Sequence, residues 1–321
     1  MKILNYKTVF ASGTYERARI PGIVTLSSGT IVSYCELRQS SDDWAVIDIG
    51  MRKSTDGGET FSGLKILVSG NGRDTVNNPL MIAQGNTLHF LYCINYRRVF
   101  YMKSTDEGDS WSLPEELTDC IKAQTKDFFW SCIATGPCHG ISLSDGALLV
   151  PVWLSFNKED EKSHHPSVIA LLYSRDNGKS WSMGEISGEL SDPSEFSVAE
   201  LSDGRIFANI RHEGDKRCRA IAEINEDFSL CNIRLCESLP DPVCCAGFIA
   251  FRDGFLFTNC NSVNERKNLT LKVLTPDFSV TRELLLSEDG GYSDISLSPD
   301  GKRAFVLFEK GKNLELCVIA L

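Results

Sequence analysis

The sequence predicts an all-β fold, a six-bladed β-propeller whose blades are four-stranded antiparallel sheets. Three observations predict it: a repeated eight-residue turn motif, a second series of tight turns that alternates with it, and short runs of β-branched and aromatic residues in between. No helical periodicity longer than two turns competes with these runs. Units of about 50 to 60 residues account for the whole chain, so we expect one domain over 1–321.

The repeated motif reads Ser-x-Asp-x-Gly-x-(Ser/Thr)-aromatic. Full copies occupy 54–61, 104–111 and 174–181, and shortened copies occupy 225–230 and 275–280. The Asp of such a motif accepts backbone N–H bonds across a tight turn, the Gly supplies a positive φ, and the aromatic ring packs beneath the hairpin. These roles are structural, so we exclude Asp56, Asp106 and Asp176 from the candidate catalytic residues.

Strand-like runs and further turns fill the intervals between the motifs. The second turn series lies at 26–30, 84–86, 143–147, 201–205, 251–255 and 299–302. The apolar runs lie at 30–37, 87–94, 147–154, 168–174, 205–211, 254–259, 269–274 and 304–309. We expect a strand from Tyr6 to Ala11 to join the last blade, because closing the ring protects the strand edges. The wider gap between the second and third full motifs leaves room for a loop over one face.

Charge and hydropathy exclude two classes of partner. The chain has 33 basic and 43 acidic side chains, a formal net charge of −10, so we expect no nucleic-acid-binding surface. The longest apolar stretch, 147–154, contains Pro151 and is far shorter than the roughly 20 residues of a membrane helix, so we expect no membrane span. The N-terminal segment lacks the apolar run of a signal peptide, and we therefore expect a cytoplasmic protein.

The twelve cysteines are expected to be reduced and mostly buried, because the sequence shows no export signal. They include no Cys-x-x-Cys pair, and the adjacent His164 and His165 lack a partner at metal-ligand spacing. We expect neither a metal nor an organic cofactor.

The first part of the chain carries charged residues at unusual places in apolar strands. Arg19 begins an Arg-Ile-Pro sequence, a Glu-x-Arg element ends at Arg38, and Asp43 follows shortly before the first full turn motif. In this succession the sequence resembles the sialidase (neuraminidase) superfamily, glycoside hydrolases built as six-bladed propellers with the same repeats. The resemblance extends from Arg19 to Glu309.

The resemblance implies roles for these first residues. Arg19 corresponds to the first member of the family's arginine triad, and Arg38 to a residue that lines the sugar pocket. Asp43 corresponds to the acid/base, with its neighbour Asp42 as the rival for that role.

The middle of the chain continues the resemblance. The segment 135–152 is similar to the family's Gly-Pro-Gly-His-Gly-Ile stretch, with Cys138 where a glycine is usual. A Glu that opens a strand and an Arg farther along match Glu195 and Arg211. The resemblance implies that Glu195 is the base partner of the nucleophile and that Arg211 is the second arginine of the triad. Glu200 is the alternative carboxylate, which we expect to be solvated on the outer side of the strand.

The last part of the chain supplies the remaining site residues. The segment 255–273 parallels the family segment that carries the third arginine, which makes Arg266 our candidate, with Arg252 and Arg282 nearby. The sequence after two glycines resembles the family's closing Tyr-Ser module, and this resemblance implies that Tyr292 is the nucleophile.

The implied chemistry suits a sugar that carries a carboxylate on its anomeric carbon, as sialic acids do. Three guanidinium groups offer planar, charge-assisted hydrogen bonds to that carboxylate. The same carboxylate would repel an Asp or Glu nucleophile, whereas a neutral tyrosine avoids the repulsion. The resemblance thus implies a retaining, exo-acting hydrolase of terminal α-linked sialic acid, with sialylated glycans or free sialosides as its partners.

Alternative interpretations remain open at this point. The substrate is either sialic acid or a related nonulosonic acid, and transfer to another sugar or release of an anhydro product needs no other type of catalytic residue. A propeller of this kind is also compatible with glycan binding without catalysis. The segment with Phe128, Phe129 and Trp130 and the pair His164–His165 either line the pocket for the acylated amine of the sugar or cap the propeller.

Overall fold

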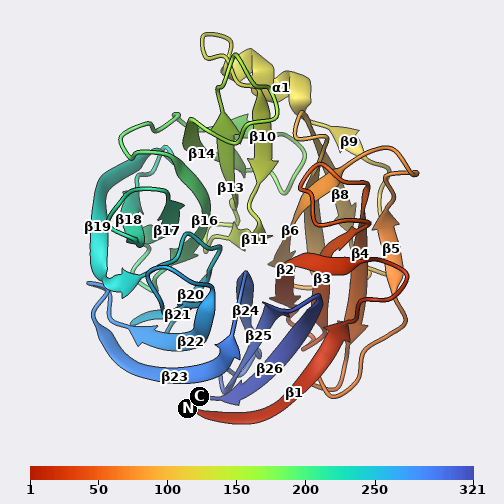
Figure 1. Cartoon of the computed structure of the whole chain (residues 1–321), viewed down its shortest axis with the longest axis vertical. Helices are drawn as coiled ribbons and strands as arrows, with labels where there is room; N and C mark the ends of the chain where they lie inside the picture. The colour runs from red at the N-terminus through yellow and green to blue at the C-terminus, as the bar shows by residue number, and fades with distance from the viewer.

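The protein folds into six small β-sheets arranged radially around a central axis, as Figure 1 shows for the computed structural model, which describes residues 1–321. Each sheet has four or five strands, and the strands of a sheet are antiparallel apart from one short parallel pair. This arrangement confirms the predicted six-bladed propeller.

The first three blades take up the first half of the chain. Blade 1 contains β2 (Arg17–Thr25), β3 (Ile31–Arg38), β4 (Ile47–Ser54) and β5 (Lys65–Val68). Blade 2 contains β6 (Val76–Gln84), β7 (Thr87–Ile94), β8 (Arg98–Ser104) and β9 (Glu115–Glu116), with β11 (Cys138–His139) added parallel to β6. Blade 3 contains β10 (Cys132–Thr135), β13 (Leu148–Ser155), β14 (Ser167–Ser174) and β15 (Ser182–Met183), with β12 (Ile141–Ser142) paired to β13.

The last three blades are regular four-stranded sheets. Blade 4 contains β16 (Pro193–Glu200), β17 (Ile206–His212), β18 (Cys218–Ile224) and β19 (Leu230–Pro240). Blade 5 contains β20 (Gly247–Phe251), β21 (Gly254–Cys260), β22 (Lys267–Leu274) and β23 (Val280–Asp289). Blade 6 contains β24 (Ser293–Leu297), β25 (Arg303–Lys310), β26 (Asn313–Ala320) and β1 (Lys2–Phe10).

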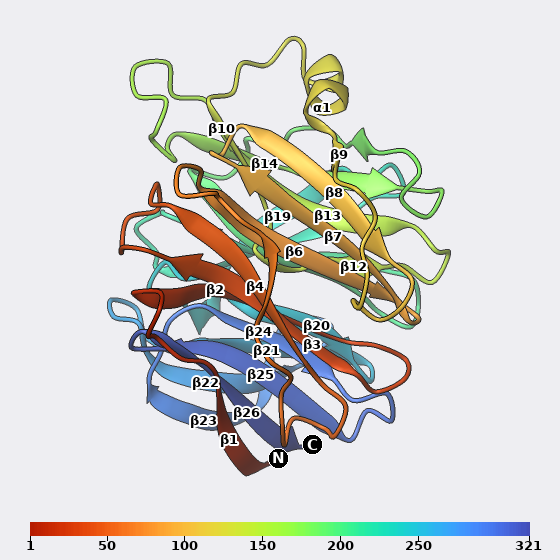
Figure 2. The same cartoon turned by 90° about the vertical axis from the view of Figure 1, so that its right-hand side faces the viewer.

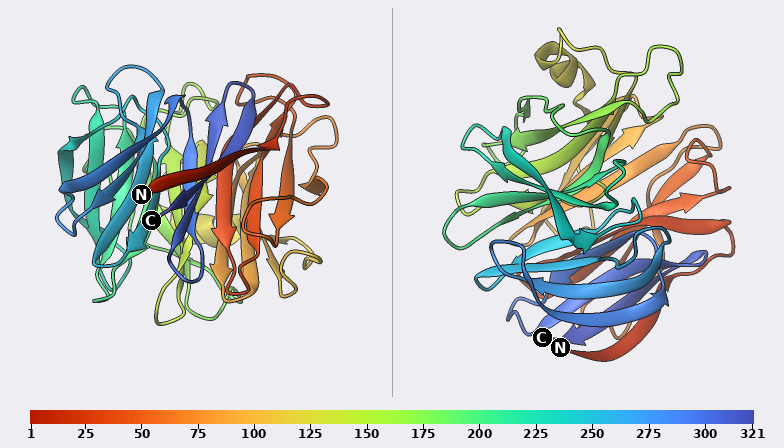
Figure 3. Two further views of the ribbon diagram at one scale, coloured as in Figure 1. Left: turned by 90° about the horizontal axis from the view of Figure 1, so that it is seen from below. Right: turned by 60° about the vertical axis from the view of Figure 1, so that its left-hand side comes forward.

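The ring closes through the two ends of the chain. Strand β1 pairs antiparallel with β26, from Lys2 opposite Ala320 to Phe10 opposite Leu314. The two termini consequently lie side by side in both views of Figure 3. The expected closing strand is confirmed, and it begins four residues earlier than Tyr6.

The repeated motif forms the turns that its sequence predicts. In the first copy Asp56 accepts a hydrogen bond from the backbone N–H of Thr60 at 3.0 Å, and Gly58 has a φ of +90°. The hydrogen bond from the Thr60 hydroxyl lowers the pKa of Asp56 to about 2. In the third copy Trp181 is buried between blades 2 and 3. The motif is therefore structural in each of these turns, far from the cavity described below.

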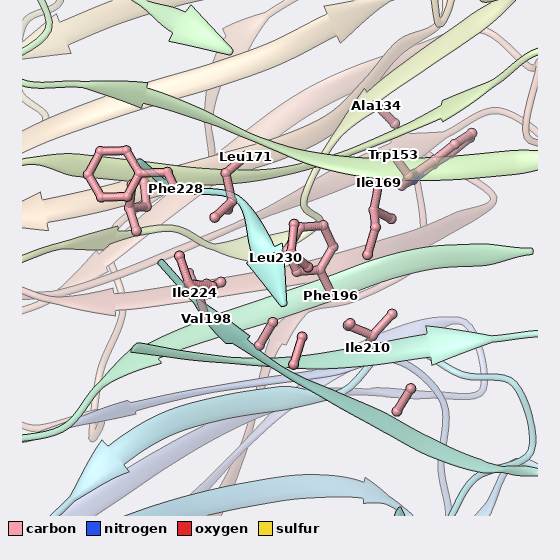
Figure 4. Packing of buried hydrophobic residues seen from close by; sticks show 14 of the residues in the cluster. Ala134, Trp153, Ile169, Leu171, Phe196, Val198, Ile210, Ile224, Phe228 and Leu230 are labelled. Atoms are coloured by element: carbon pink, nitrogen blue, oxygen red, sulfur yellow. The ribbon is translucent and has the colours of Figure 1, made fainter. Parts of the chain in front are cut away.

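Hydrophobic layers between neighbouring blades hold the ring together. Figure 4 shows the layer between blades 3 and 4, where Trp153 and Leu171 of one sheet and Phe196 and Ile210 of the next are buried. A fully buried side chain of this size contributes about 1.5–3 kcal/mol through the hydrophobic effect. Most of the twelve cysteines are also buried, as the sequence predicts.

The long interval in blades 2 and 3 contains the one helix of the protein, α1 (Thr118–Gln124). Figure 2 shows α1 and the neighbouring loops at the rim of the propeller rather than over its axis. The helix has 7 residues, too few to cross a membrane. The loop between β13 and β14, by contrast, brings His164 and His165 to the central cavity.

The innermost strand of each blade faces the axis. Strand β2 contacts β6 and β24, and β20 contacts β16 and β24, so these strands form the wall of the central channel. Residues at their N-terminal ends line one cavity, and residues at their C-terminal ends line another. The fold thus collects side chains from distant parts of the chain at each end of the axis.

Candidate active site

The cavity at the N-terminal ends of the inner strands is rich in charged side chains. Every candidate residue proposed from the resemblance lines it: Arg19, Arg38, Asp43, Glu195, Arg211, Arg266 and Tyr292. The other lining residues are Ile20, Asn78, Tyr96, Trp153, His164, His165, Ser194 and Glu213. The structure therefore brings all seven residues together in one cavity.

Tyr292 lies at the centre of this group, immediately before β24. Its hydroxyl donates a hydrogen bond to Oε1 of Glu195 and accepts one from Nη1 of Arg211 at 2.7 Å. The same Nη1 also donates to Oε2 of Glu195. Burial raises the pKa of Tyr292 well above its ordinary value, and the positive charge of Arg211 opposes this rise. The arrangement places a carboxylate base and a cation on one phenol.

The register of one hairpin explains why Glu195 and Arg211 meet. In blade 4, Phe196 of β16 pairs with Ile210 of β17, so the next residues outward are Glu195 and Arg211. A β-bulge between Pro193 and Phe196 interrupts the regular pairing at this point. Cross-strand neighbours in an antiparallel sheet approach closely. The pairing of this hairpin therefore brings Glu195 and Arg211 together although they are distant in the sequence. Glu200, at the other end of β16, instead accepts hydrogen bonds from the turn residue Ser144.

Two further guanidinium groups flank the Tyr292 ring. Cζ of Arg19 lies 5.1 Å from the ring centroid and Cζ of Arg266 lies 5.2 Å from it. Arg19 donates from Nε to Oε1 of Glu309 at 3.0 Å. Arg266 is exposed and donates only to the carbonyl oxygen of Val243, at 3.3 Å, so no carboxylate of the protein neutralises it.

The rival arginines lie elsewhere. Arg252 and Arg282 line a separate cavity beside the chain termini, together with Met1 and Leu321. Arg266 is thus the one of the three that faces Tyr292.

Asp43 lies in the loop after β3 of blade 1, whereas Glu195 belongs to β16 of blade 4, and both line the cavity. Nη1 of Arg38 donates to its Oδ1 at 2.5 Å, and Nη1 of Arg19 lies 3.7 Å from the same oxygen. Burial raises the pKa of Asp43, but the charges of Arg38 and Arg19 outweigh burial and lower it below its ordinary value. Asp42 is exposed and accepts a hydrogen bond from the backbone N–H of Trp44 at 2.9 Å.

Arg38 is held by a buried carboxylate that the sequence analysis did not assign. Nε of Arg38 donates to Oε2 of Glu36 at 2.7 Å, and Oε1 of Glu36 accepts from the backbone N–H of Asn78 at 2.7 Å. Glu36 is fully buried and Arg38 is 1% exposed. A charge so deeply buried is tolerated because it is paired and hydrogen-bonded.

An aromatic wall completes the cavity. The imidazole of His164 lies 4.8 Å from the ring centroid of Tyr96 and 5.0 Å from that of Trp153. Burial lowers the pKa of His164, so this side chain is neutral near pH 7. The wall is therefore largely apolar beside the charged half of the site.

The aromatic segment before β10 does not reach the cavity. Phe128, Phe129 and Trp130 line a surface groove near α1, together with the basic side chains of Lys122 and Lys126. The sequence left open whether these two segments line the pocket or cap the propeller. In the structure the His164–His165 pair lines the cavity, and the aromatic segment lies at the rim.

Several cavity residues had no sequence signal that distinguished them. Trp153 reads as an ordinary core aromatic in a strand-like run, Tyr96 follows the run 87–94, and Glu213 reads as a loop residue. Glu36 and Glu309 carried a usable signal, because each is a charge within an otherwise apolar strand.

Comparison with known proteins agrees with this architecture. The family model of the BNR repeat-like domain matches residues 67–304. A sialidase of Bacteroides fragilis is 28% identical over 337 residues, which cover 91% of this chain and 59% of the relative. The solved Hadza microbial sialidase Hz136 has a TM-score of 0.85 at 23% identity, covering 98% of this chain and 68% of that protein. A Trypanosoma rangeli sialidase solved in complex with sialic acid has a TM-score of 0.75 at 20% identity, covering 98% of this chain and 57% of that protein.

These matches establish the family. The chain spans 59% of the length of its Bacteroides fragilis relative, and the structural likeness at 23% and 20% identity shows the shared fold. The family model, in contrast, covers most of the chain, from blade 1 to blade 6. The chain therefore belongs to the BNR-repeat family, as a β-propeller of the sialidase superfamily.

Proposed function

We propose that the protein is an exo-acting, retaining sialidase that releases terminal α-linked sialic acid from glycoconjugates or free sialosides. The observation that carries the proposal is the convergence of three guanidinium groups on a tyrosine whose hydroxyl is bonded to a glutamate. The known activity and bound sugar of the sialidases that this chain resembles support the same assignment.

The arginines suit a carboxylate on the anomeric carbon. Arg266 has no acidic partner, Nε of Arg211 is buried without a hydrogen-bond acceptor, and Arg19 shares its charge with Glu309. Unpaired donors in a partly buried site favour an anionic ligand, because a bound carboxylate satisfies them. In our proposal the substrate carboxylate lies between these three side chains, which fixes the anomeric carbon beside Tyr292.

Tyr292 then acts as the nucleophile. Its phenol is a weak nucleophile while protonated, and Glu195 already accepts its hydrogen bond. As Oη of Tyr292 bonds to the anomeric carbon, Glu195 takes the phenol proton and the surrounding arginines stabilise the negative charge that develops. A tyrosine also avoids the repulsion that a carboxylate nucleophile would meet from the substrate carboxylate.

Asp43 serves as the acid/base on the other side of the sugar. It gives a proton to the departing glycosidic oxygen in the first step and takes one from the attacking water in the second. The water oxygen replaces Oη of Tyr292 on the anomeric carbon, and Glu195 returns the proton to the phenol. Two inversions at one carbon give net retention.

Hydrolysis of a fluorogenic sialoside by the purified protein tests the proposal. We expect release of the fluorophore, and nuclear magnetic resonance of the fresh product should show the α-anomer before mutarotation. The same assay on glycosides of related nonulosonic acids identifies the preferred sugar. Absence of release from every glycoside across the range of about pH 4 to 8 would refute the enzymatic assignment.

A further inference from the structure

Two carboxylates of the protein already accept hydrogen bonds from Arg211. Its Nη1 donates to Glu195 and Tyr292, and its Nη2 donates to Oε1 of Glu213 at 3.0 Å. Glu213 directly follows β17, and its side chain is 32% exposed at the edge of the cavity. A substrate carboxylate that approaches Arg211 must therefore compete with Glu213 for the N–H groups of Nη2.

A histidine bonds to the same oxygen of Glu213. Nε2 of His165 lies 3.3 Å from Oε1 of Glu213, and Nδ1 of His165 lies 3.8 Å from Oδ1 of Asp192. The backbone N–H of Glu213 donates to the carbonyl oxygen of Asp192, which fixes the two acidic residues on either side of the imidazole. The remaining titratable or charged groups near His165 are Arg211 and the adjacent His164.

We propose that Glu213 and His165 form a positioning pair. Through this pair, the affinity of Arg211 for the substrate carboxylate depends on whether His165 is protonated. When His165 is protonated, it shares the negative charge of Glu213 and leaves Nη2 of Arg211 to the substrate. When His165 is neutral, Glu213 keeps its bond to Nη2 and competes with the substrate. This inference rests on the proposed function, because it concerns the affinity of the same site for its anionic ligand.

The electrostatic surroundings fit such a proton switch. The hydrogen bond to Glu213 is the largest cause that raises the pKa of His165 above its ordinary value of about 6.5. The hydrogen bond from His165, with the charge of Arg211, lowers the pKa of Glu213 to about 2, so Glu213 is ionised throughout the working range. Burial keeps His164 neutral, and it therefore adds no opposing charge near pH 7. His165 is the group that changes charge.

The sign of the pH effect follows from these charges. His165 is cationic below its raised pKa, where it both relieves Arg211 and attracts the substrate carboxylate. Substrate affinity consequently rises as pH falls through this pKa, and by linkage a bound carboxylate raises the pKa of His165 further. The phenol and its base partner are not part of this exchange, so the effect belongs to KM rather than to kcat.

Steady-state kinetics of the full chain across about pH 5 to 8 test the pair. In wild type we expect KM for the fluorogenic sialoside to fall about fivefold from the upper to the lower end of this range, the low end of measured couplings between sites. In His165→Gln this fall should disappear while the pH dependence of kcat remains. In Glu213→Gln, KM should be low at both ends, because the competitor for Nη2 is neutral. The matched control is Glu237→Gln, which removes an exposed carboxylate paired with Lys216 far from the cavity.

A titration without substrate separates this inference from the proposed function. The C2–H resonance of His165, identified by its absence in His165→Gln, should titrate above about pH 6.5 in wild type and at lower pH in Glu213→Gln. Wild type without sialidase activity would overturn the function while leaving this titration readable. An unchanged KM profile in an active His165→Gln, or a His165 titration that Glu213→Gln does not move, would overturn the positioning pair.

Discussion

The hydroxyl of Tyr292 on blade 6 is bonded to the carboxylate of Glu195 on blade 4, although 97 positions and a whole blade separate the two residues. The pair exists because the N-terminal ends of the inner strands lie at the same end of the central channel. Arg211, which bonds to both, belongs to the same hairpin as Glu195. A contact within one hairpin, between Glu195 and Arg211, and a contact between distant blades thus bring the phenol of Tyr292, its base and a cation together.

Replacing Tyr292 tests the nucleophile. Tyr292→Phe removes only the hydroxyl, so we expect kcat to fall by at least about 10³-fold with little change in the affinity for free sialic acid. Fluorogenic turnover gives the first quantity and calorimetric titration with sialic acid gives the second. The control is Tyr173→Phe, a tyrosine of β14 outside the cavity. Turnover within tenfold of wild type in Tyr292→Phe would assign the nucleophile elsewhere.

Arg266 allows a clean test of carboxylate binding, because it is exposed and makes no ion pair within the protein. In Arg266→Ala we expect KM to rise by about 10- to 100-fold through the loss of a charge-assisted hydrogen bond, with the melting temperature unchanged. Arg252→Ala, which removes a rival arginine of the other cavity, should leave KM at the wild-type value. Equal KM values in the two variants would remove Arg266 from the binding site.

Asp43 and Asp42 can be distinguished by the leaving group of the substrate. An aryl alcohol departs without a proton, whereas a sugar alcohol needs one from the general acid. We therefore expect Asp43→Asn to lose at least about 100-fold more activity on a sialyl-galactoside than on an aryl sialoside in the first step, and Asp42→Asn to lose neither. Pre-steady-state release of the aryl alcohol and chromatography of the released galactoside measure the two. The reverse ranking of the variants would assign the role to Asp42.

Glu36 is expected to matter for stability before it matters for catalysis. Its replacement by Ala removes the buried partner of Arg38 and leaves the half-exposed Asp43 as the one carboxylate paired with this guanidinium, so we expect a cost of up to about 3–5 kcal/mol. Denaturant unfolding of Glu36→Ala measures this loss. Glu16→Ala, which breaks the exposed pair with Lys312, should cost less than about 1 kcal/mol. A similar free energy of unfolding for both variants would show that Asp43 alone compensates the charge of Arg38.

The opposite end of the channel contains an ion pair whose stability should depend on pH. Nδ1 of His139 lies 2.7 Å from Oδ1 of Asp294, and Oδ2 of Asp294 accepts from the backbone N–H of Ile23 at 2.8 Å. Burial lowers the pKa of His139, but the charge of Asp294 outweighs burial and raises it above about 6.5.

A raised pKa in the folded state adds stability that is complete below the unfolded pKa and is lost as pH rises through the folded pKa. The melting temperature of wild type should therefore fall more between about pH 6 and about pH 9 than that of His139→Gln. Differential scanning calorimetry at both pH values gives the comparison. Parallel changes in the two proteins would mean that His139 does not titrate on unfolding.

The fold was predictable because its determinants are local. The turn around Asp56 is specified by residues that bond to each other within the motif, and Glu195 and Arg211 lie at positions that one hairpin brings opposite each other. These relationships leave a mark in the sequence as fixed types at fixed spacings. Features that depend on such short-range geometry can be predicted from the sequence.

The wall of the cavity was not predictable for the opposite reason. Trp153 and Glu213 face the site because of how blades pack around the axis, and nothing in their own segments separates them from core or loop residues. The aromatic segment with Phe129 illustrates the converse, since its composition resembles a binding loop and it lies at the rim near α1. Three-dimensional context decides such cases.

The carboxylate of Glu309 determines how late in synthesis the site can form. Its Oε1 accepts from Nε of Arg19 and from the backbone N–H of Ile20, and its Oε2 accepts from the backbone N–H of Tyr292. Arg19 and Glu309 are 290 positions apart. During synthesis Arg19 is made long before Glu309, so the bond between them can form only when almost the entire chain has been synthesised. A nascent chain therefore cannot form the complete pocket in stages. The pocket is complete only when the last blade has been synthesised and has folded.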